Sequence, residues 1–305
     1  MFQISYKWSN CQTCNNIQYF SIKMNSDKTT QPVKKSAMKV LEETSRTFYI
    51  PISYLPERIK EAVASAYLCL RAIDEVEDHP TLENSLKSKI LKQISYTLQT
   101  TCIGATLEDL TPDWCGAEDK LPEVTLRIAE WCLLAPSDIA PRIWDATASM
   151  ADRMAYWAER NFEIKTKKDL DAYTFSVAGA VGLLLSELWE WYEGVKTNRE
   201  LAVAFGRGLQ ITNILRNKNE DKERGVSFYP EGWTEKEMQA YARENLNKAE
   251  EYKASLPEGS AALTFCKIPL SLAVATLDFL QEGKEKLSRS DVLSIVKKCL
   301  GVGGH

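Results

Sequence analysis

The chain has 305 residues, of which 44% are hydrophobic and 26% are charged, so it can bury a large core in one large domain or two ordinary ones. Its formal net charge is -4 and it has no block of basic residues, which excludes a typical nucleic-acid-binding surface.

The first 37 residues are polar and lack the basic start, apolar middle and cleavage site of a secretory signal. We interpret 1–37 as a loosely ordered extension, because a clean helical pattern starts at Met38. A catalytic domain is expected over 38–300 and a flexible tail over 301–305.

From Met38 onward the apolar residues recur at helical spacing, and no alternating strand pattern is found, so the predicted class is all-α. Glycine and proline lie mainly between the segments. No internal repeat or Pro/Ser-rich linker divides the pattern, which favours a single helical domain. The expected helices cover 37–47, 56–77, 81–99, 123–134, 137–165, 168–192, 200–218, 234–256, 261–280 and 288–300.

The eight cysteines are scattered, mostly within apolar helical patterns, and they predict reduced core residues in a cytoplasmic protein. A lone Cys11–Cys14 pair and only two histidines do not make a zinc site. No stretch reaches the roughly 18 uninterrupted apolar residues that a membrane span needs, so we expect at most peripheral membrane contact.

Acidic residues gather at the end of the helix expected over 56–77. Asp74 and Asp78 are four residues apart and share one helix face, with Arg71 one turn before them. Like charges at this spacing repel, so a bound cation should bridge them. A solvated helix tail is the alternative, but the preceding turns at 66–70 are apolar nearly all round, as in a buried helix. Carboxylates, water and substrate phosphates are the usual ligands of Mg²⁺.

A second polar stripe follows the helix expected over 200–218. Its members step by three, four and four residues along an otherwise apolar helix: Gln210, Asn213, Asn217 and Asp221. A polar stripe between apolar neighbours is costly unless it lines a cavity. Nearby cations could hold a leaving phosphate: Arg216, Lys222 and Arg224.

Two further segments allow both a structural and a functional interpretation. Gly179 and Gly182 could provide close helix packing, or they could bend the helix and leave room for a long apolar ligand while Tyr173 points its hydroxyl into the pocket. Ser45 and Arg46 could be an ordinary helix terminus, or they could clamp a phosphate.

These motifs together resemble the squalene/phytoene synthase family in order and spacing over roughly residues 40 to 295. The first acidic motif is closer to the squalene synthase branch. The resemblance rests on Thr-Ser-Arg-Thr-Phe at 44–48, Tyr-Leu-Cys-Leu-Arg-Ala-Ile-Asp-Glu-Val-Glu-Asp at 67–78, the segment 173–182, Leu-Gln-Ile-Thr-Asn-Ile-Leu-Arg at 209–216, Glu220-Asp221 and Tyr229-Pro230.

The resemblance implies an isoprenoid-synthase helical bundle around a central cavity. In that family Mg²⁺ and basic residues remove diphosphate from one prenyl donor, and a second prenyl diphosphate captures the allylic cation. The resulting cyclopropyl intermediate is ionised again and rearranged. The implied reaction here joins two farnesyl diphosphates head to head into squalene or a related terpenoid.

The resemblance also assigns roles by position. Asp74, Asp78 and Asp221 would bind Mg²⁺ together with Asn217, and Gln210 and Asn213 would line that wall. Ser45, Arg46, Arg71 and Arg216 would hold diphosphate. Tyr173 would assist ionisation or proton removal, and Phe48 and Tyr67 would shape the cavity.

One departure leaves alternatives open. The family's second motif begins with Asp, whereas this chain has the neutral Asn217. The same site could instead ionise one prenyl diphosphate, as a terpene cyclase or a prenyl diphosphate phosphatase. A non-catalytic paralogue acting in assembly or binding is a third hypothesis. Use of NADPH stays open because squalene synthases have no Rossmann motif, and the chain could be a monomer or a homodimer.

Overall fold

The computed structural model describes residues 26–223, 225–284 and 286–301, without the side chains of 26–32 and Arg46. Every regular element in these ranges is helical and none is a strand, which confirms the all-α prediction. The first half comprises α1 (Ser26–Thr44), α2 (Arg46–Ser53), α3 (Glu57–Glu77), α4 (Asn84–Thr100), η2 (Glu118–Lys120), α5 (Glu123–Leu126), α6 (Ile128–Leu134) and α7 (Ala140–Glu159).

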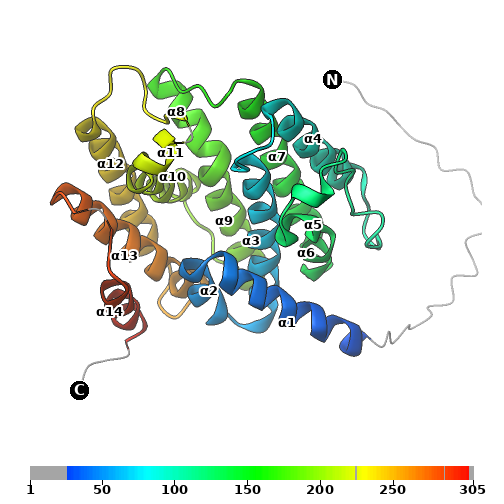
Figure 1. Cartoon of the computed structure of the whole chain (residues 1–305). Helices are drawn as coiled ribbons and strands as arrows, with labels where there is room; N and C mark the ends of the chain where they lie inside the picture. The colour runs from blue at the N-terminus through cyan, green and yellow to red at the C-terminus, as the bar shows by residue number, and fades with distance from the viewer. Residues whose placement is uncertain (1–25, 224, 285, 302–305) are drawn as a thin grey trace, which may run out of the picture.

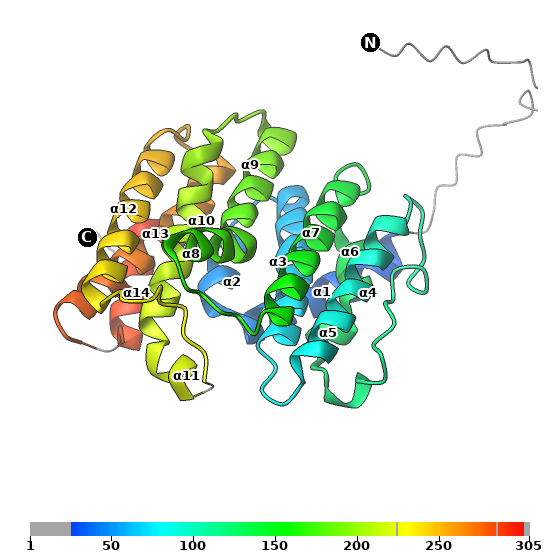
Figure 2. The same ribbon diagram turned by 90° about the horizontal axis from the view of Figure 1, so that it is seen from above.

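The second half comprises α8 (Lys167–Thr174), η3 (Phe175–Gly179), α9 (Ala180–Glu193), α10 (Arg199–Arg216), α11 (Lys218–Glu223), α12 (Glu235–Ala254), α13 (Ala261–Gln281) and α14 (Arg289–Leu300). Helix α3 lies near the middle of the molecule (Figure 1). Seen from above, α4, α6 and α7 lie on one side of α3, and α9, α10 and α12 lie on the other (Figure 2). The helix that carries the first acidic motif is therefore enclosed on both sides.

The N-terminal boundary differs from the expectation. Helix α1 begins at Ser26, so residues 26–37, predicted to belong to a loosely ordered extension, are helical, and residues 1–25 lie outside the described part. Ala37, Val40 and Leu41 are buried at helical spacing, and α1 packs on α3. This apolar stripe ties α1 to the core.

The long helix expected over 137–165 is shorter in the structure. It ends at Glu159 because Asn161 and Phe162 adopt left-handed backbone conformations, with φ of 54° and 55°. The left-handed turn brings the Phe162 ring into the core, where it is 6% exposed. The helix expected over 123–134 is divided at Arg127 into α5 and α6.

Two helical stretches in the described residues are long and apolar enough to cross a membrane by length and composition. They are Lys167–Glu193, with 50% of its most apolar window buried in the protein, and Ala261–Gln281, with 56% buried. Core helices pass the same test, and both stretches contribute to the hydrophobic core.

The small residues of the segment 173–182 serve close packing against α10. A Cβ on Gly182 would lie 2.1 Å from the Ala202 carbonyl oxygen, and a Cβ on Gly206 would lie 2.1 Å from the Ala178 carbonyl oxygen. The two helices therefore touch backbone to backbone. The same segment is a π-helix over Phe175–Gly179, a feature that bends helices and is frequent at functional sites.

We predict that Gly182→Ala destabilises the protein by about 2 kcal/mol, because the new methyl group would overlap the Ala202 carbonyl. Helix propensity alone predicts the opposite sign, a gain of about 1 kcal/mol. Denaturant unfolding measures the difference. Gly179→Ala is the graded control, because its Cβ would meet only side-chain atoms at 3.2 Å. A stabilised Gly182→Ala variant would contradict the close crossing.

Candidate functional site

The last turns of α3 carry the first acidic motif. Asp74 is half-buried and Asp78 is exposed, and the Asp78 N–H donates to the Asp74 carbonyl at 2.8 Å. Both carboxylates therefore share one helix face, as expected. The Oδ1 atom of Asp74 is buried and has no hydrogen-bond partner among the described residues. These acids also lie at the negative end of the helix dipole, which raises the free energy of their ionised forms.

Arg71 does not neutralise Asp74 directly. It forms an ion pair with Glu75, and its Nε atom is buried without a partner in the described part of the chain. Burial raises the pKa of Asp74 to about 7; the attraction of Arg71 opposes this shift, and the nearby Asp78 and Glu75 add to it. Without a bound cation, Asp74 is therefore largely protonated below neutral pH.

Glu77 is a site residue that the sequence motifs did not single out. It is 7% exposed, and burial followed by the charges of Asp78 and Asp74 raises its pKa well above the usual value. The Tyr173 hydroxyl donates to Glu77 Oε1 at 3.0 Å. A signal was present in the sequence, since Glu77 lies four residues after the buried Ile73 on the apolar stripe of α3.

Tyr173 is held on three sides. Its hydroxyl, predicted to point into a pocket, is engaged by Glu77 because a buried carboxyl group needs a donor. Its ring stacks on Phe228 at 4.7 Å between centroids and meets the edge of Trp157 at 5.5 Å. Burial, then the neighbouring acids, raise the pKa of Tyr173, so the phenol keeps its proton.

The residues of α2 form an apolar wall with α3 and α13. The ring of Phe48 lies 5.7 Å from that of Tyr67 and 6.3 Å from that of Phe265, a residue that the motifs did not include. The Ser45 hydroxyl accepts from the Phe48 N–H at 3.3 Å and caps α2, which is the structural interpretation of that motif. Arg46 opens α2, but its side chain lies outside the described part.

The second wall spans the junction of α10 and α11. Asn217 caps α10; its N–H donates to the Asn213 carbonyl, and its own carbonyl accepts from the Asp221 N–H, each at 2.9 Å. The helical hydrogen-bond pattern thus continues through Asn217, where α10 ends and α11 begins. Gln210, Asn213 and Asn217 are half-buried, and Asp221 is 6% exposed.

The side chain of Asn217 already has a hydrogen-bond partner. The exposed Arg216 donates from Nε to the Asn217 side-chain oxygen at 3.0 Å. The two predicted site residues are therefore adjacent in space as well as in sequence. The Arg224 predicted beside them lies outside the described residues, and Lys222 is exposed.

The segment after α11 contacts Tyr173 on α8 and Asp221 of the second wall. Phe228 stacks on Tyr173, and the Val226 N–H donates to the Asp221 carbonyl at 3.0 Å. The neighbouring Tyr229 hydroxyl is buried with no partner in the described chain. Burial, followed by the charges of Glu235 and Asp221, raises the pKa of Tyr229 to about 12.

The chemistry of these walls fits a hard cation. Within the described residues, no three His, Cys, Asp or Glu side chains are grouped closely enough to hold a metal ion between them. Mg²⁺, however, commonly uses one or two carboxylates and takes its other ligands from water and substrate phosphates. The unpartnered oxygen of Asp74 and the unpartnered Nε of Arg71 suit a cation and an anion, respectively.

Comparison with known proteins identifies the family of the chain. The family model described as squalene/phytoene synthase matches residues 41–240. The chain belongs to the squalene/phytoene synthase family. A squalene synthase of Schizosaccharomyces pombe is 30% identical over 272 residues, which are 78% of this chain and 58% of that protein. The predicted resemblance and its squalene synthase branch are confirmed.

Solved structures show the same fold. The complex of TcSQS with the ligand E5700 matches with a TM-score of 0.70 and 24% identity, over 86% of this chain and 84% of that one. A dehydrosqualene synthase matches with a TM-score of 0.59 and 19% identity, over 90% of this chain and 97% of that one. By contrast, the chain spans about three-fifths of the length of the curated squalene synthases from S. pombe and Rattus norvegicus that it matches.

We predict that Asp74→Asn stabilises the metal-free protein at about pH 8 by on the order of 1 kcal/mol and changes little at about pH 4. The folded-state pKa of Asp74 is raised to about 7, so the folded protein binds its proton more tightly than the unfolded chain does. The stability contributed by that proton is present at low pH and is lost as pH rises through the folded pKa.

Thermal unfolding in a chelator at both pH values measures this difference. Added Mg²⁺ should reduce or reverse the advantage of Asp74→Asn, because the ion stabilises only the carboxylate. A variant that is less stable than the parent at about pH 8 in chelator would show that Asp74 carries no uncompensated cost.

Proposed function

We propose that the protein is a Mg²⁺-dependent prenyltransferase that joins two prenyl diphosphates head to head through a cyclopropyl intermediate. Farnesyl diphosphate is the expected substrate, and squalene or a related terpenoid is the expected product. Family membership supports the reaction class. The single observation that carries the metal and diphosphate assignment is the buried, unpartnered carboxylate oxygen of Asp74 beside the unpartnered Nε of Arg71.

In this proposal the two walls bind the diphosphate end of the substrate. Asp74 and Asp78 on α3, with Asn217 and Asp221 on the other wall, would hold Mg²⁺, which neutralises the negative charge of the departing diphosphate. Arg71, Arg216, Arg46 and Ser45 would bind its remaining oxygens. Gln210 and Asn213 would orient it by hydrogen bonds.

The apolar part of the site would handle the carbocation. Phe48, Tyr67 and Phe265 present aromatic rings, whose faces attract a cation and whose bulk excludes water. Tyr173 keeps a proton on its hydroxyl and holds it toward Glu77. In this arrangement its oxygen can accept a hydrogen bond from an adjacent water, and it can donate to the leaving group only if the hydroxyl turns away from Glu77. It can accept a substrate proton only after passing its own to Glu77.

Two further assignments extend the proposal. NADPH would be needed if the product is squalene, because the second ionisation must then end in reduction. The protein would work in the cytoplasm with at most peripheral membrane contact, as a monomer or a homodimer.

A second candidate function is favoured by one observation. Asn217 removes a negative charge from the second wall, and its side-chain oxygen accepts from Arg216. A site with fewer acids could ionise a single prenyl diphosphate and release a cyclic hydrocarbon or an alcohol. A non-catalytic role is the third candidate, and the retained acids at 74, 78 and 221 argue against it.

The deciding experiment incubates the purified protein with Mg²⁺ and farnesyl diphosphate, with and without NADPH, and identifies the products by mass spectrometry. A thirty-carbon hydrocarbon or a cyclopropyl diphosphate would establish the head-to-head reaction. A fifteen-carbon alcohol or cyclic hydrocarbon would establish the single-substrate reaction instead. No turnover with farnesyl or longer prenyl diphosphates would favour the non-catalytic role.

We predict that Asp74→Ala and Asp221→Ala each lower turnover by about a hundredfold or more, because each removes a charge that would hold the metal. Far-ultraviolet circular dichroism should show an unchanged helical fold. Asp119→Ala, at an exposed acid of the short helix η2, is the matched control and should keep its activity. Parental activity in either site variant would remove that residue from the metal assignment.

We predict that Asn217→Asp lowers the Mg²⁺ concentration needed for half-maximal activity about threefold or more, because it restores an anionic oxygen ligand. Asn219→Asp adds the same charge at an exposed position two residues away and should leave the metal dependence unchanged. Equal effects of both variants would mean that only net charge matters. If Asn217→Asp changed neither rate, products nor metal dependence, the replacement of the family's Asp by Asn217 would have no effect on the reaction.

A further inference from the structure

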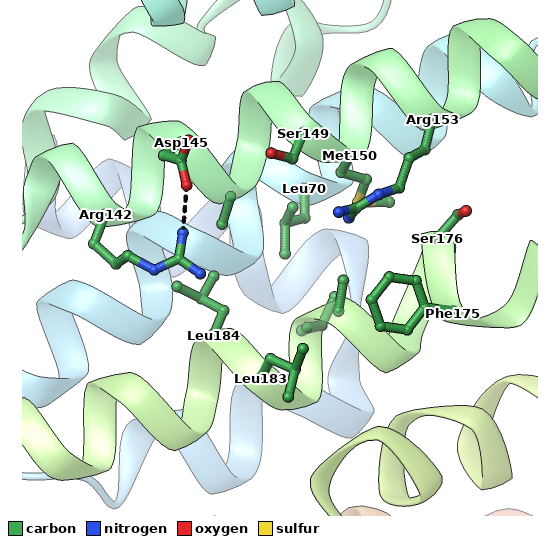
Figure 3. A pocket seen from close by; sticks show the side chains of 13 residues that line it. Leu70, Arg142, Asp145, Ser149, Met150, Arg153, Phe175, Ser176, Leu183 and Leu184 are labelled. Atoms are coloured by element: carbon green, nitrogen blue, oxygen red, sulfur yellow. Dashed lines mark hydrogen bonds and ion pairs between the residues drawn. The ribbon is translucent and has the colours of Figure 1, made fainter. Parts of the chain in front are cut away.

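A separate pocket of about 150 Å³ lies between α7 and the η3–α9 segment (Figure 3). Its apolar lining includes Leu70, Met150, Leu183 and Leu184. Leu70 is the only α3 residue in the lining, and none of the residues assigned to the diphosphate site lines the pocket. The pocket is therefore a different place from the acidic walls.

Two arginines on α7 border this pocket, and they are paired differently. Arg142 forms ion pairs with Asp145 and Glu187. Arg153 is half-buried and has no hydrogen bond or ion pair with any described residue; its guanidinium carbon lies 5.1 Å from the centre of the Phe175 ring. In Figure 3 the Arg153 side chain extends over the pocket beside Met150 and Phe175.

The charge around Arg153 limits what can bind it. Burial lowers the pKa of Arg153, and Asp145 and Asp152 attract it only through space. Arginine nevertheless stays charged in proteins, so the guanidinium carries a positive charge without a direct counter-ion. A planar carboxylate can accept two parallel hydrogen bonds from it. A phosphate ester with two charges would suit the pocket less well, because only one uncompensated cation is present and Asp145 lies near.

The size and lining of the pocket define the rest of the ligand. A cavity of about 150 Å³ has room for a molecule the size of benzene, which has six carbon atoms, and this one is lined by polar as well as apolar side chains. The lining combines this apolar space with Ser149, which lies one helical turn before Arg153 on the same face of α7. A polar head and an apolar tail can therefore be bound together.

We propose that this pocket binds an aliphatic monocarboxylate, with the carboxylate on Arg153 and about six carbons of the chain between α7 and α9. Longer chains would extend through the open side of the pocket. The proposal does not depend on the reaction at the acidic walls, because the two places share no assigned residue.

The test uses the full chain labelled with ¹³C at its methionine methyl groups and titrated with hexanoate. Met150 lines the pocket, whereas Met238 is buried in α12 away from it and serves as an internal reference. The Met150 resonance is assigned with Met150→Leu. We expect hexanoate to shift Met150 and not Met238, and hexan-1-ol to bind about tenfold or more weakly because it lacks the charge.

Two arginine variants separate recognition by Arg153 from general electrostatics. Arg153→Gln should weaken hexanoate binding about tenfold and leave hexan-1-ol binding within about twofold. Arg160→Gln removes an exposed cation that does not line the pocket, and it should leave hexanoate binding unchanged. Thermal unfolding checks that both variants are folded.

Several results would overturn the proposal. These are the absence of a Met150 shift, equal affinities for hexanoate and hexan-1-ol, an equal loss of affinity in Arg160→Gln, and a shift of Met238 as large as that of Met150.

Discussion

The backbone contact between α10 and the η3–α9 segment is the constraint on which the site depends. Two glycines permit it, at Gly182 against Ala202 and at Gly206 against Ala178. Residues 202, 206, 210, 213 and 217 step by four, four, three and four, so the face of α10 that makes this contact continues as the polar stripe. The two helices run antiparallel, and Arg207, next to Gly206, donates to the Asp171 carbonyl at 2.9 Å, about two turns before Ala178. The close crossing thus fixes the orientation of the α10 face that carries the side-chain amides of Gln210, Asn213 and Asn217.

The acidic wall of α3 carries an energetic cost that packing elsewhere must offset. Asp74 and Glu77 are both removed from water near the carboxyl end of their helix, and burial raises the pKa of each. A proton, or a bound cation, relieves the cost for Asp74. Glu77 is relieved in a different way, by the Tyr173 hydroxyl at 3.0 Å. Neighbouring carboxyl groups therefore have separate tasks: the unpartnered oxygen of Asp74 remains available to a ligand, whereas Glu77 is committed to the tyrosine.

The sequence predicted the helices and both acidic segments because helical periodicity and residue spacing are local properties. It did not predict the left-handed turn at Asn161 and Phe162, since burial of Phe162 stabilises that conformation only in the folded chain. It also left the role of Gly182 undecided, because the deciding atom, the Ala202 carbonyl oxygen, lies on another helix. For the same reason the partner of Tyr173 could not be predicted. The roles of Asp78, Asn217 and Asp221 in metal binding stay predictions, whereas the contact between Phe48 and Tyr67 is present in the structure.

The hydrogen bond between Arg216 and Asn217 links the departure from the family motif to the charge balance of the site. An aspartate at 217 would pair with Arg216 and lower its capacity to attract a phosphate, whereas the neutral amide leaves the full positive charge of Arg216 in place. The substitution therefore removes one negative charge from the proposed metal ligands without removing a positive charge from the proposed anion ligands. A diphosphate should then depend more on arginine and less on the metal at this wall than at α3, where Glu75 already occupies Arg71. In such a site the α3 wall would bind the diphosphate mainly through the metal, and the second wall would bind it mainly through Arg216.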